Sequence, residues 1–172
     1  MIGTCRLYRK SKILRKSHII PNFVFKWLKD TSATGVFRPG INSKKRAQDG
    51  VKQYLLCDDC EQLFGRWEKK FKDSIFLPLS LGKSNRFQYR AWLLKFAASI
   101  SWRVLDFGYK QDLSHISPMH LNKAKEALEA WRKFLLDERP HPDKYQQHIL
   151  PMDSIEDHND LNMPTNINSY IL

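Results

Sequence analysis

The sequence lacks the features that would place it in a membrane, in a secretory pathway or among disulfide-rich proteins. No stretch of its 172 residues approaches about 18 uninterrupted apolar residues, so we expect no transmembrane helix. Charged side chains interrupt every apolar stretch near the N-terminus, and no signal peptide is visible there. The three cysteines are an odd number, which argues against a disulfide framework and for a reducing compartment. We therefore expect a cytoplasmic protein without membrane attachment.

Apolar residues and positive charge are both plentiful. Hydrophobic residues make up 42% of the chain and aromatic residues 12%, which is enough to bury a core and excludes a fully disordered chain. The net charge is +11, and residues 1–72 alone hold 17 basic and 6 acidic side chains. Residues 141–172 hold 1 basic and 5 acidic side chains. A basic region of this kind attracts nucleic acid through its phosphates, so we expect nucleic acid, and DNA in particular, as a partner.

Apolar spacing predicts an α+β chain in three parts. Residues 1–77 form the first part, with extended segments near Ser17–Ile20 and at 52–56, a helix at 22–29 and a second helix running from Cys60. A linker at 78–85 is followed by two helices, over 87–107 and from Ser117-Pro118 onward, whose apolar stripes predict an antiparallel helical hairpin within 78–142. This appendage also offers a face for a protein partner. Residues 143–172 form an acidic tail that is partly extended or disordered.

The spacing of Cys57 and Cys60 is typical of a zinc knuckle. Two thiolates three residues apart, at a turn that enters a helix, can both bind one Zn²⁺. Cys5 is the candidate third ligand, but Tyr8 stands where the second cysteine of its own knuckle would be. Water, His18 or a nearby aspartate is left as the fourth ligand. Two other interpretations stay open: three buried reduced thiols without metal, or a redox-active pair, which the flanking aspartates disfavour.

The order of these segments resembles the HNH endonucleases. A half-knuckle, the strand Ser17-His18-Ile19-Ile20-Pro21, a basic loop and a second CxxC that opens a helix follow one another as in that family. The wider run 17–23, together with 55–61 and Trp67-Glu68, looks like an uncharacterised bacterial subgroup of HNH-like proteins. The resemblance covers residues 4–72. It implies a small ββα-metal, treble-clef-like zinc module ahead of the helical hairpin.

The resemblance also implies a hydrolytic site. His18 matches the general base that activates water against a phosphodiester, and Glu61 matches a ligand of catalytic Mg²⁺ or Mn²⁺. Ser17 stands where the family usually has a metal-binding aspartate. The family's middle asparagine, which orients the histidine, has no counterpart here, and Gln53 is the candidate substitute.

Basic residues around this motif are candidates for holding phosphates without reading bases. They lie before His18 and in the loop between the two halves of the motif: Arg15, Lys16, Lys44, Lys45 and Arg46. Three functions therefore compete. The first is an HNH-type, metal-dependent nuclease. The second is a catalytically degenerate zinc-knuckle module that binds nucleic acid or a partner protein. The third is a subunit of a larger assembly whose basic face docks an acidic partner.

Overall fold

The chain folds into an α+β arrangement of a small antiparallel sheet and several helices. The structure, a computed structural model, describes residues 1–32, 35, 49–109, 111, 114 and 116–151. Its elements, in chain order, are β1 (Ile2–Thr4), β2 (Ser11–His18), α1 (Asn22–Thr31), β3 (Lys52–Cys57), α2 (Asp58–Phe71), the π-helix η2 (Lys72–Phe76), α3 (Leu77–Ser80), α4 (Ala91–Gly108) and α5 (Pro118–Leu135). The expected α+β class is confirmed.

The sheet has the order β1-β2-β3, and β2 is its central strand. Both pairings are antiparallel, with Ile2 opposite Ile13 in one and His18 opposite Lys52 in the other. The register of the second pairing shifts between Arg15 and Lys16. The pairing skips Leu55 of β3, and Leu55, Leu56 and Cys57 are buried in succession where strict alternation would have exposed one of them.

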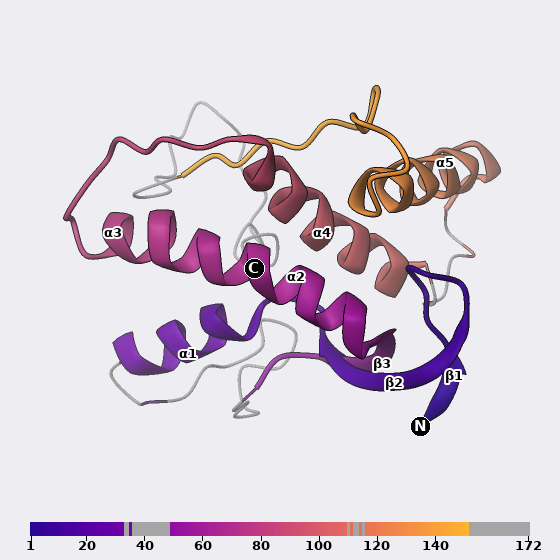
Figure 1. The fold of residues 1–172 in the computed structure, drawn as a ribbon, viewed down its shortest axis with the longest axis horizontal. Coiled ribbons are helices and arrows are strands. Elements are labelled where there is room, and N and C mark those ends of the chain that lie inside the picture. Colours follow the sequence, from indigo (N-terminus) through magenta and orange to yellow (C-terminus); the bar gives the residue numbers. More distant parts are fainter. Residues whose placement is uncertain (33–34, 36–48, 110, 112–113, 115, 152–172) are drawn as a thin grey trace.

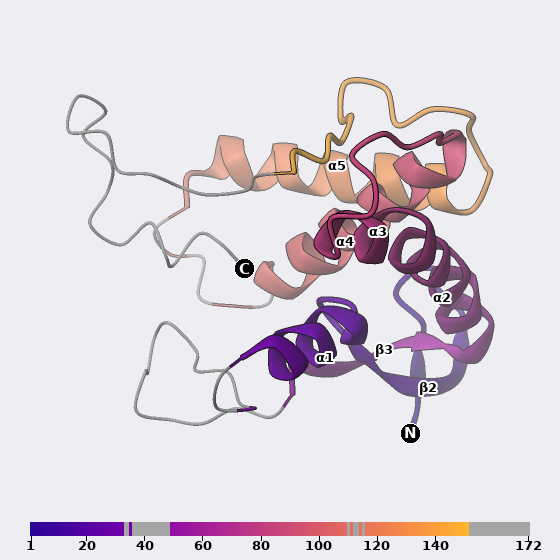
Figure 2. The ribbon, with the colours of Figure 1, turned by 90° about the vertical axis from the view of Figure 1, so that its left-hand side faces the viewer.

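The helices stack on one side of the sheet. Figure 1 shows α2 crossing above the strands, and Figure 2 shows α4 and then α5 layered beyond α2. One hydrophobic cluster joins these layers, with Leu7 and Leu55 from the strand region, Phe64 from α2, Trp102 from α4 and Trp131 from α5. The helical hairpin expected from the apolar stripes is confirmed, and the Ser117 hydroxyl accepts the backbone N–H of His120 as its N-cap.

Ion pairs also join the hairpin to the N-terminal turn. Arg6 donates to Asp106 of α4 at 2.6 Å, and Arg9 pairs with Glu129 of α5. The Asp106 side chain is only 3% exposed, so the carboxylate of the Arg6–Asp106 pair is buried. The hairpin and the cysteine-bearing segment thus share both a core and charged contacts.

The expected linker from Pro78 is wrong at its start, because the chain stays helical through Ser80. The π-helix of residues 72–76 connects α2 to α3 without a break. Proline lacks an N–H and crowds the carbonyl four residues earlier, so the wider π turn accommodates Pro78 where a regular helix would not. The i to i+5 spacing also brings Phe76 above Phe71, and both rings pack against Phe23 of α1.

No helix in the described part of the chain has both the length and the apolar character needed to cross a bilayer.

Candidate functional site

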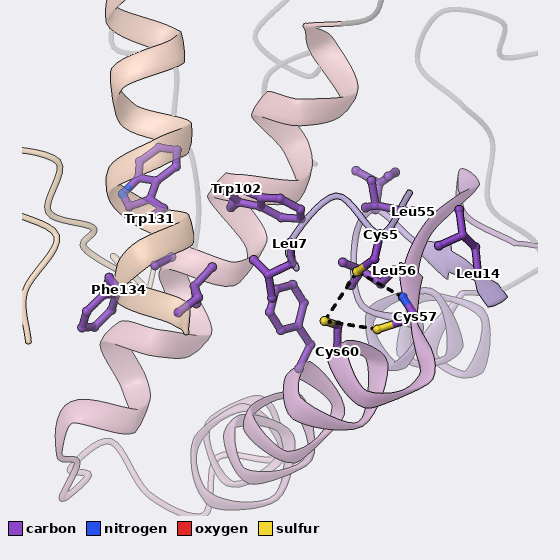
Figure 3. Close-up of a cluster of buried hydrophobic side chains, with 14 of the residues drawn as sticks. Cys5, Leu7, Leu14, Leu55, Leu56, Cys57, Cys60, Trp102, Trp131 and Phe134 are labelled. Carbon is purple, nitrogen blue, oxygen red and sulfur yellow. Dashed lines mark hydrogen bonds between the residues drawn. The ribbon is translucent and has the colours of Figure 1, made fainter. Parts of the chain in front are cut away.

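Three buried cysteines meet where the N-terminal turn, β3 and α2 come together. Figure 3 shows the sulfurs of Cys5, Cys57 and Cys60 pointing toward one another beside Leu7 and Leu56. All three thiols are free, and their sulfur atoms lie within 4.8 Å of one another. The cluster expected from the sequence is therefore assembled, and three close, buried sulfurs are able to hold a metal ion such as zinc.

The spacing of the sulfurs matches a tetrahedral zinc site. Cys60 Sγ lies 3.6 Å from Cys5 Sγ and 3.6 Å from Cys57 Sγ. Tetrahedral zinc with Zn–S bonds of about 2.3 Å holds its sulfurs about 3.8 Å apart. The backbone N–H of Cys57 also donates to Cys5 Sγ at 3.4 Å, which stabilises a negative charge on that sulfur.

Local structure explains why these cysteines converge. Arg9 adopts a left-handed φ of 58° and its N–H donates to the Cys5 carbonyl, which closes a tight turn after Cys5. Cys57 is the last residue of β3, and Cys60 lies in the first turn of α2, where the helix dipole favours a thiolate. The hydrogen bond between the two thiols lowers the pKa of Cys5 and raises the pKa of Cys60.

A fourth protein ligand is not among the cysteine, histidine, aspartate or glutamate side chains of the described residues. His18 was one candidate, but its ring contacts Asp49. Asp59 was another, and its exposed carboxylate pairs with Lys12. Tyr8 is half-buried near the cluster. Its burial and the neighbouring Cys60 raise the pKa of its phenol.

His18 is held by a partner that the sequence analysis missed. Its Nε2 lies 2.8 Å from Asp49 Oδ1, and its ring stacks on Phe25 of α1 at a centroid distance of 6.3 Å. Lys52 and then His18 hold the pKa of the Asp49 carboxyl well below its usual range, so Asp49 is an anion. A Cβ on Gly50 would stand 2.1 Å from the Phe25 ring, so glycine is needed for this close approach. The Asp49-Gly50 pair after the basic loop was the sequence feature that could have indicated this contact with His18.

Gln53, the predicted partner of His18, is placed differently. It lies opposite Ser17 on the paired strands, whereas His18 lies opposite Lys52. Because side chains alternate between the faces of a sheet, Gln53 and His18 point to opposite faces. The structure therefore brings Asp49, and not Gln53, to the His18 ring.

Glu61 lies close to both His18 and Ser17. Burial raises the pKa of its carboxyl, while the Ser17 hydroxyl and the charges of Arg103 and His18 partly oppose that shift. Glu61 Oε1 and Ser17 Oγ are both buried, and the Ser17 hydroxyl is hydrogen-bonded to the Glu61 carboxyl. A buried carboxyl beside a hydroxyl offers oxygen atoms of the kind that hard divalent cations bind.

Arg103 reaches this place from α4, and the sequence analysis did not select it. Its side chain is 3% exposed, and Nη2 pairs with Glu68 Oε1 at 2.7 Å. Nη1 donates to the backbone carbonyl of His18 at 3.0 Å, and the guanidinium lies 5.3 Å from the centroid of the Phe64 ring. Its only sequence signal was a charged residue inside an otherwise apolar helical stripe.

The predicted phosphate-binding residues are only partly described. Arg15 and Lys16 are exposed on β2, and Arg15 donates to Asp58 Oδ1 at 2.9 Å. Part of the positive charge of Arg15 is therefore neutralised within the chain. Lys44, Lys45 and Arg46 lie outside the described residues.

Comparison with family models, with curated proteins and with solved structures finds no match for this chain.

Proposed function

We propose that the protein is an HNH-like, metal-dependent nuclease in which a treble-clef-like zinc module carries the site. The pair of His18 and anionic Asp49 beside the buried carboxylate of Glu61 is the observation that supports this function most strongly. A strand histidine and a carboxylate from the first turn of the helix after β3 are the two groups that the resemblance implies. Hydrolysis of a phosphodiester needs a general base and a metal-binding carboxylate that lie close together.

In this function His18 acts as the general base. When Nε2 carries the proton and donates to Asp49, Nδ1 is the basic nitrogen that accepts a proton from water. The water oxygen then bonds to phosphorus, the bond from phosphorus to the leaving oxygen breaks, and that oxygen takes a proton from solvent. Asp49 stabilises the imidazolium that forms, and Phe25 holds the ring in place.

The oxygen atoms near His18 suit a hard divalent cation. Glu61 Oε1 and Ser17 Oγ are buried next to each other, and oxygen is the donor that Mg²⁺ and Mn²⁺ prefer. Glu61 would hold the ion, with Ser17 beside it. When bound, such an ion stabilises the negative charge that develops on the phosphate.

The test is a cleavage assay on plasmid and single-stranded DNA with Mg²⁺ or Mn²⁺. A positioned general base contributes about 100- to 10,000-fold, so His18→Ala is expected to lose cleavage by that factor while nucleic-acid binding is retained. His148→Ala, at an exposed histidine far along the chain, is the matched control and should cleave normally. Cleavage that survives His18→Ala would contradict the proposal.

The second candidate function is a catalytically degenerate zinc-knuckle module that binds nucleic acid. Arg103 favours it, because its cationic guanidinium lies close enough to influence the Glu61 carboxyl and would repel a divalent ion. This function predicts binding without cleavage under every metal condition, in the wild type as well as in His18→Ala. The same assay therefore separates the two candidates.

Both functions predict salt-dependent binding through the basic segment. Replacing Lys44, Lys45 and Arg46 by alanine is expected to weaken binding to all sequences alike. The slope of log K against log salt should fall by up to about 3 on duplex DNA. Alanine at Lys123 and Lys125, exposed on α5, is the control and should change the slope little. An unchanged slope in the triple variant would favour an acidic protein partner for this segment.

A further inference from the structure

An aromatic pocket lies at the end of the molecule where α1, η2, α3 and the start of α4 meet. Its volume is about 710 Å³, and five of its lining side chains are aromatic: Trp27, Phe71, Phe76, Phe87 and Tyr89. The polar groups in the lining are few, and they include Ser80 and Asn85. Figure 1 shows the chain leaving α3 and looping back to α4 at this end.

The pocket has rigid walls and one exposed ring at its mouth. Phe71 stacks on Phe96 with ring centroids 4.0 Å apart, and Trp27 meets Phe76 edge to face at 5.4 Å. Tyr89 is 65% exposed, although it lines the pocket. A flat aromatic ring exposed at the mouth of a pocket is suited to stacking.

A second hollow, of about 520 Å³, shares part of this wall. Phe87 and Tyr89 line both hollows, and the second also contains Arg90 and Trp92. The Lys70 ammonium lies 5.0 Å from the centroid of the Trp92 ring. Two adjacent hollows that share an aromatic wall can bind two consecutive flat groups of one ligand.

The charged side chains that line these hollows are basic. Lys70 and Arg90 line the second hollow, and no acidic side chain of the described residues lines either one. Lys83, Arg86 and Arg90 are exposed on the loop that frames the pocket, and no ion pair links them to any described residue. Stacking rings flanked by unpaired cations are the combination that binds single-stranded nucleic acid.

We infer that this pocket binds unpaired bases of single-stranded nucleic acid, with Phe87 and Tyr89 as the stacking rings and Arg86 and Arg90 on the phosphates. The inference deepens the proposed nuclease function by naming a substrate class, and to that extent rests on it. Helix α1 contacts both the pocket and the His18 site, since Phe23 packs against Phe71 and Phe76 while Phe25 stacks on His18. Bases inside a duplex are unavailable for such stacking, so single strands are expected to bind more tightly than duplex.

The test measures fluorescence anisotropy of labelled oligodeoxythymidine and oligouridine of about 12 nucleotides, within the span of known single-strand sites. Protein carrying His18→Ala is used so that the probe stays intact. Adding Tyr89→Ala is expected to weaken binding about 5- to 150-fold, because one stacking contact is lost. Tyr89→Phe should keep wild-type affinity. Leu81→Ala, at an exposed residue of the same loop that does not line the pocket, is the matched control.

The charge component has its own readout. Replacing Arg86 and Arg90 together by alanine should weaken binding and reduce the salt slope by up to about 1.4, given a slope of about −0.7 per phosphate on single strands. Equal affinity for a duplex of the same length, or unchanged affinity in Tyr89→Ala, would overturn the inference. Loss of binding to phosphatidylserine vesicles in Tyr89→Ala, with oligonucleotide binding unchanged, would assign the pocket to a membrane surface instead.

The inference and the proposed function can fail separately. If the wild type cleaves DNA and Tyr89→Ala binds the oligonucleotides with full affinity, the inference is wrong and the nuclease function stands. If oligonucleotide binding depends on Tyr89 but no metal supports cleavage, the inference stands and the nuclease function is wrong.

Discussion

Purified protein is expected to contain about one zinc per chain, and removal of that zinc is expected to unfold the sheet and α2. Structural zinc contributes about 10–16 kcal/mol to the folding of zinc-finger peptides at pH 7, which matches or exceeds the whole stability of a typical domain. Here the cluster joins Cys5 to Cys60, residues that are far apart in the chain but whose sulfurs lie 3.6 Å apart. Elemental analysis gives the metal content, and circular dichroism with a chelator follows the fold.

Zinc added back after chelation should restore the spectrum, which controls for irreversible damage. Cys57→Ser should behave like the chelated protein, because a neutral hydroxyl is a much poorer zinc ligand than a thiolate. A folded protein with zinc near zero would mean that the three thiols pack as small apolar groups, since free cysteine is commonly buried.

Arg103→Met is expected to destabilise the protein by about 3–5 kcal/mol, the cost of breaking a buried ion pair. The substitution keeps most of the side-chain volume but leaves Glu68, which is 20% exposed, without its partner, and the His18 carbonyl without its donor. Urea unfolding monitored by tryptophan fluorescence measures the change. The residual exposure of Glu68 places the expected loss toward the lower end of that range.

A second substitution separates charge from packing. Adding Glu68→Gln to Arg103→Met should recover part of the loss, because the buried charge is then removed. Arg139→Met is the matched control, since its pair with Asp143 is more exposed and should contribute no more than about 1 kcal/mol. A loss below about 1 kcal/mol in Arg103→Met would mean that the pair of Arg103 and Glu68 contributes little to holding α4 in place.

The longer helices were predictable because their side chains repeat at helical spacing. Both helices of the hairpin and the N-cap Ser117 follow from local pattern, as does the strand that leads into Cys57. The continuation through Pro78 was not predictable, because a proline usually ends a helix and the π turn that accommodates it has no local signature.

The site was predictable only where its residues are close in sequence or belong to a known pattern. Cys57 and Cys60 are three residues apart, and Cys5 followed from the knuckle pattern. The partner of His18 is Asp49, 31 residues away, and the orientation of strand faces decided against Gln53. Arg103 lies 85 residues from His18 and reaches it only through the packing of α4 on α2, which no local pattern reveals.

The π-helix at Lys72–Phe76 makes the geometry of the aromatic pocket depend on the length of one short segment. A single residue in a helix corresponds to a rotation of about 100°. Deleting one residue of 72–76 would remove the π turn, and every side chain after the deletion would turn by that angle relative to α2. Phe76 would then leave Phe23 and Trp27, which it now contacts edge to face. Length changes are therefore tolerated less well in this segment than substitutions that keep its residue count.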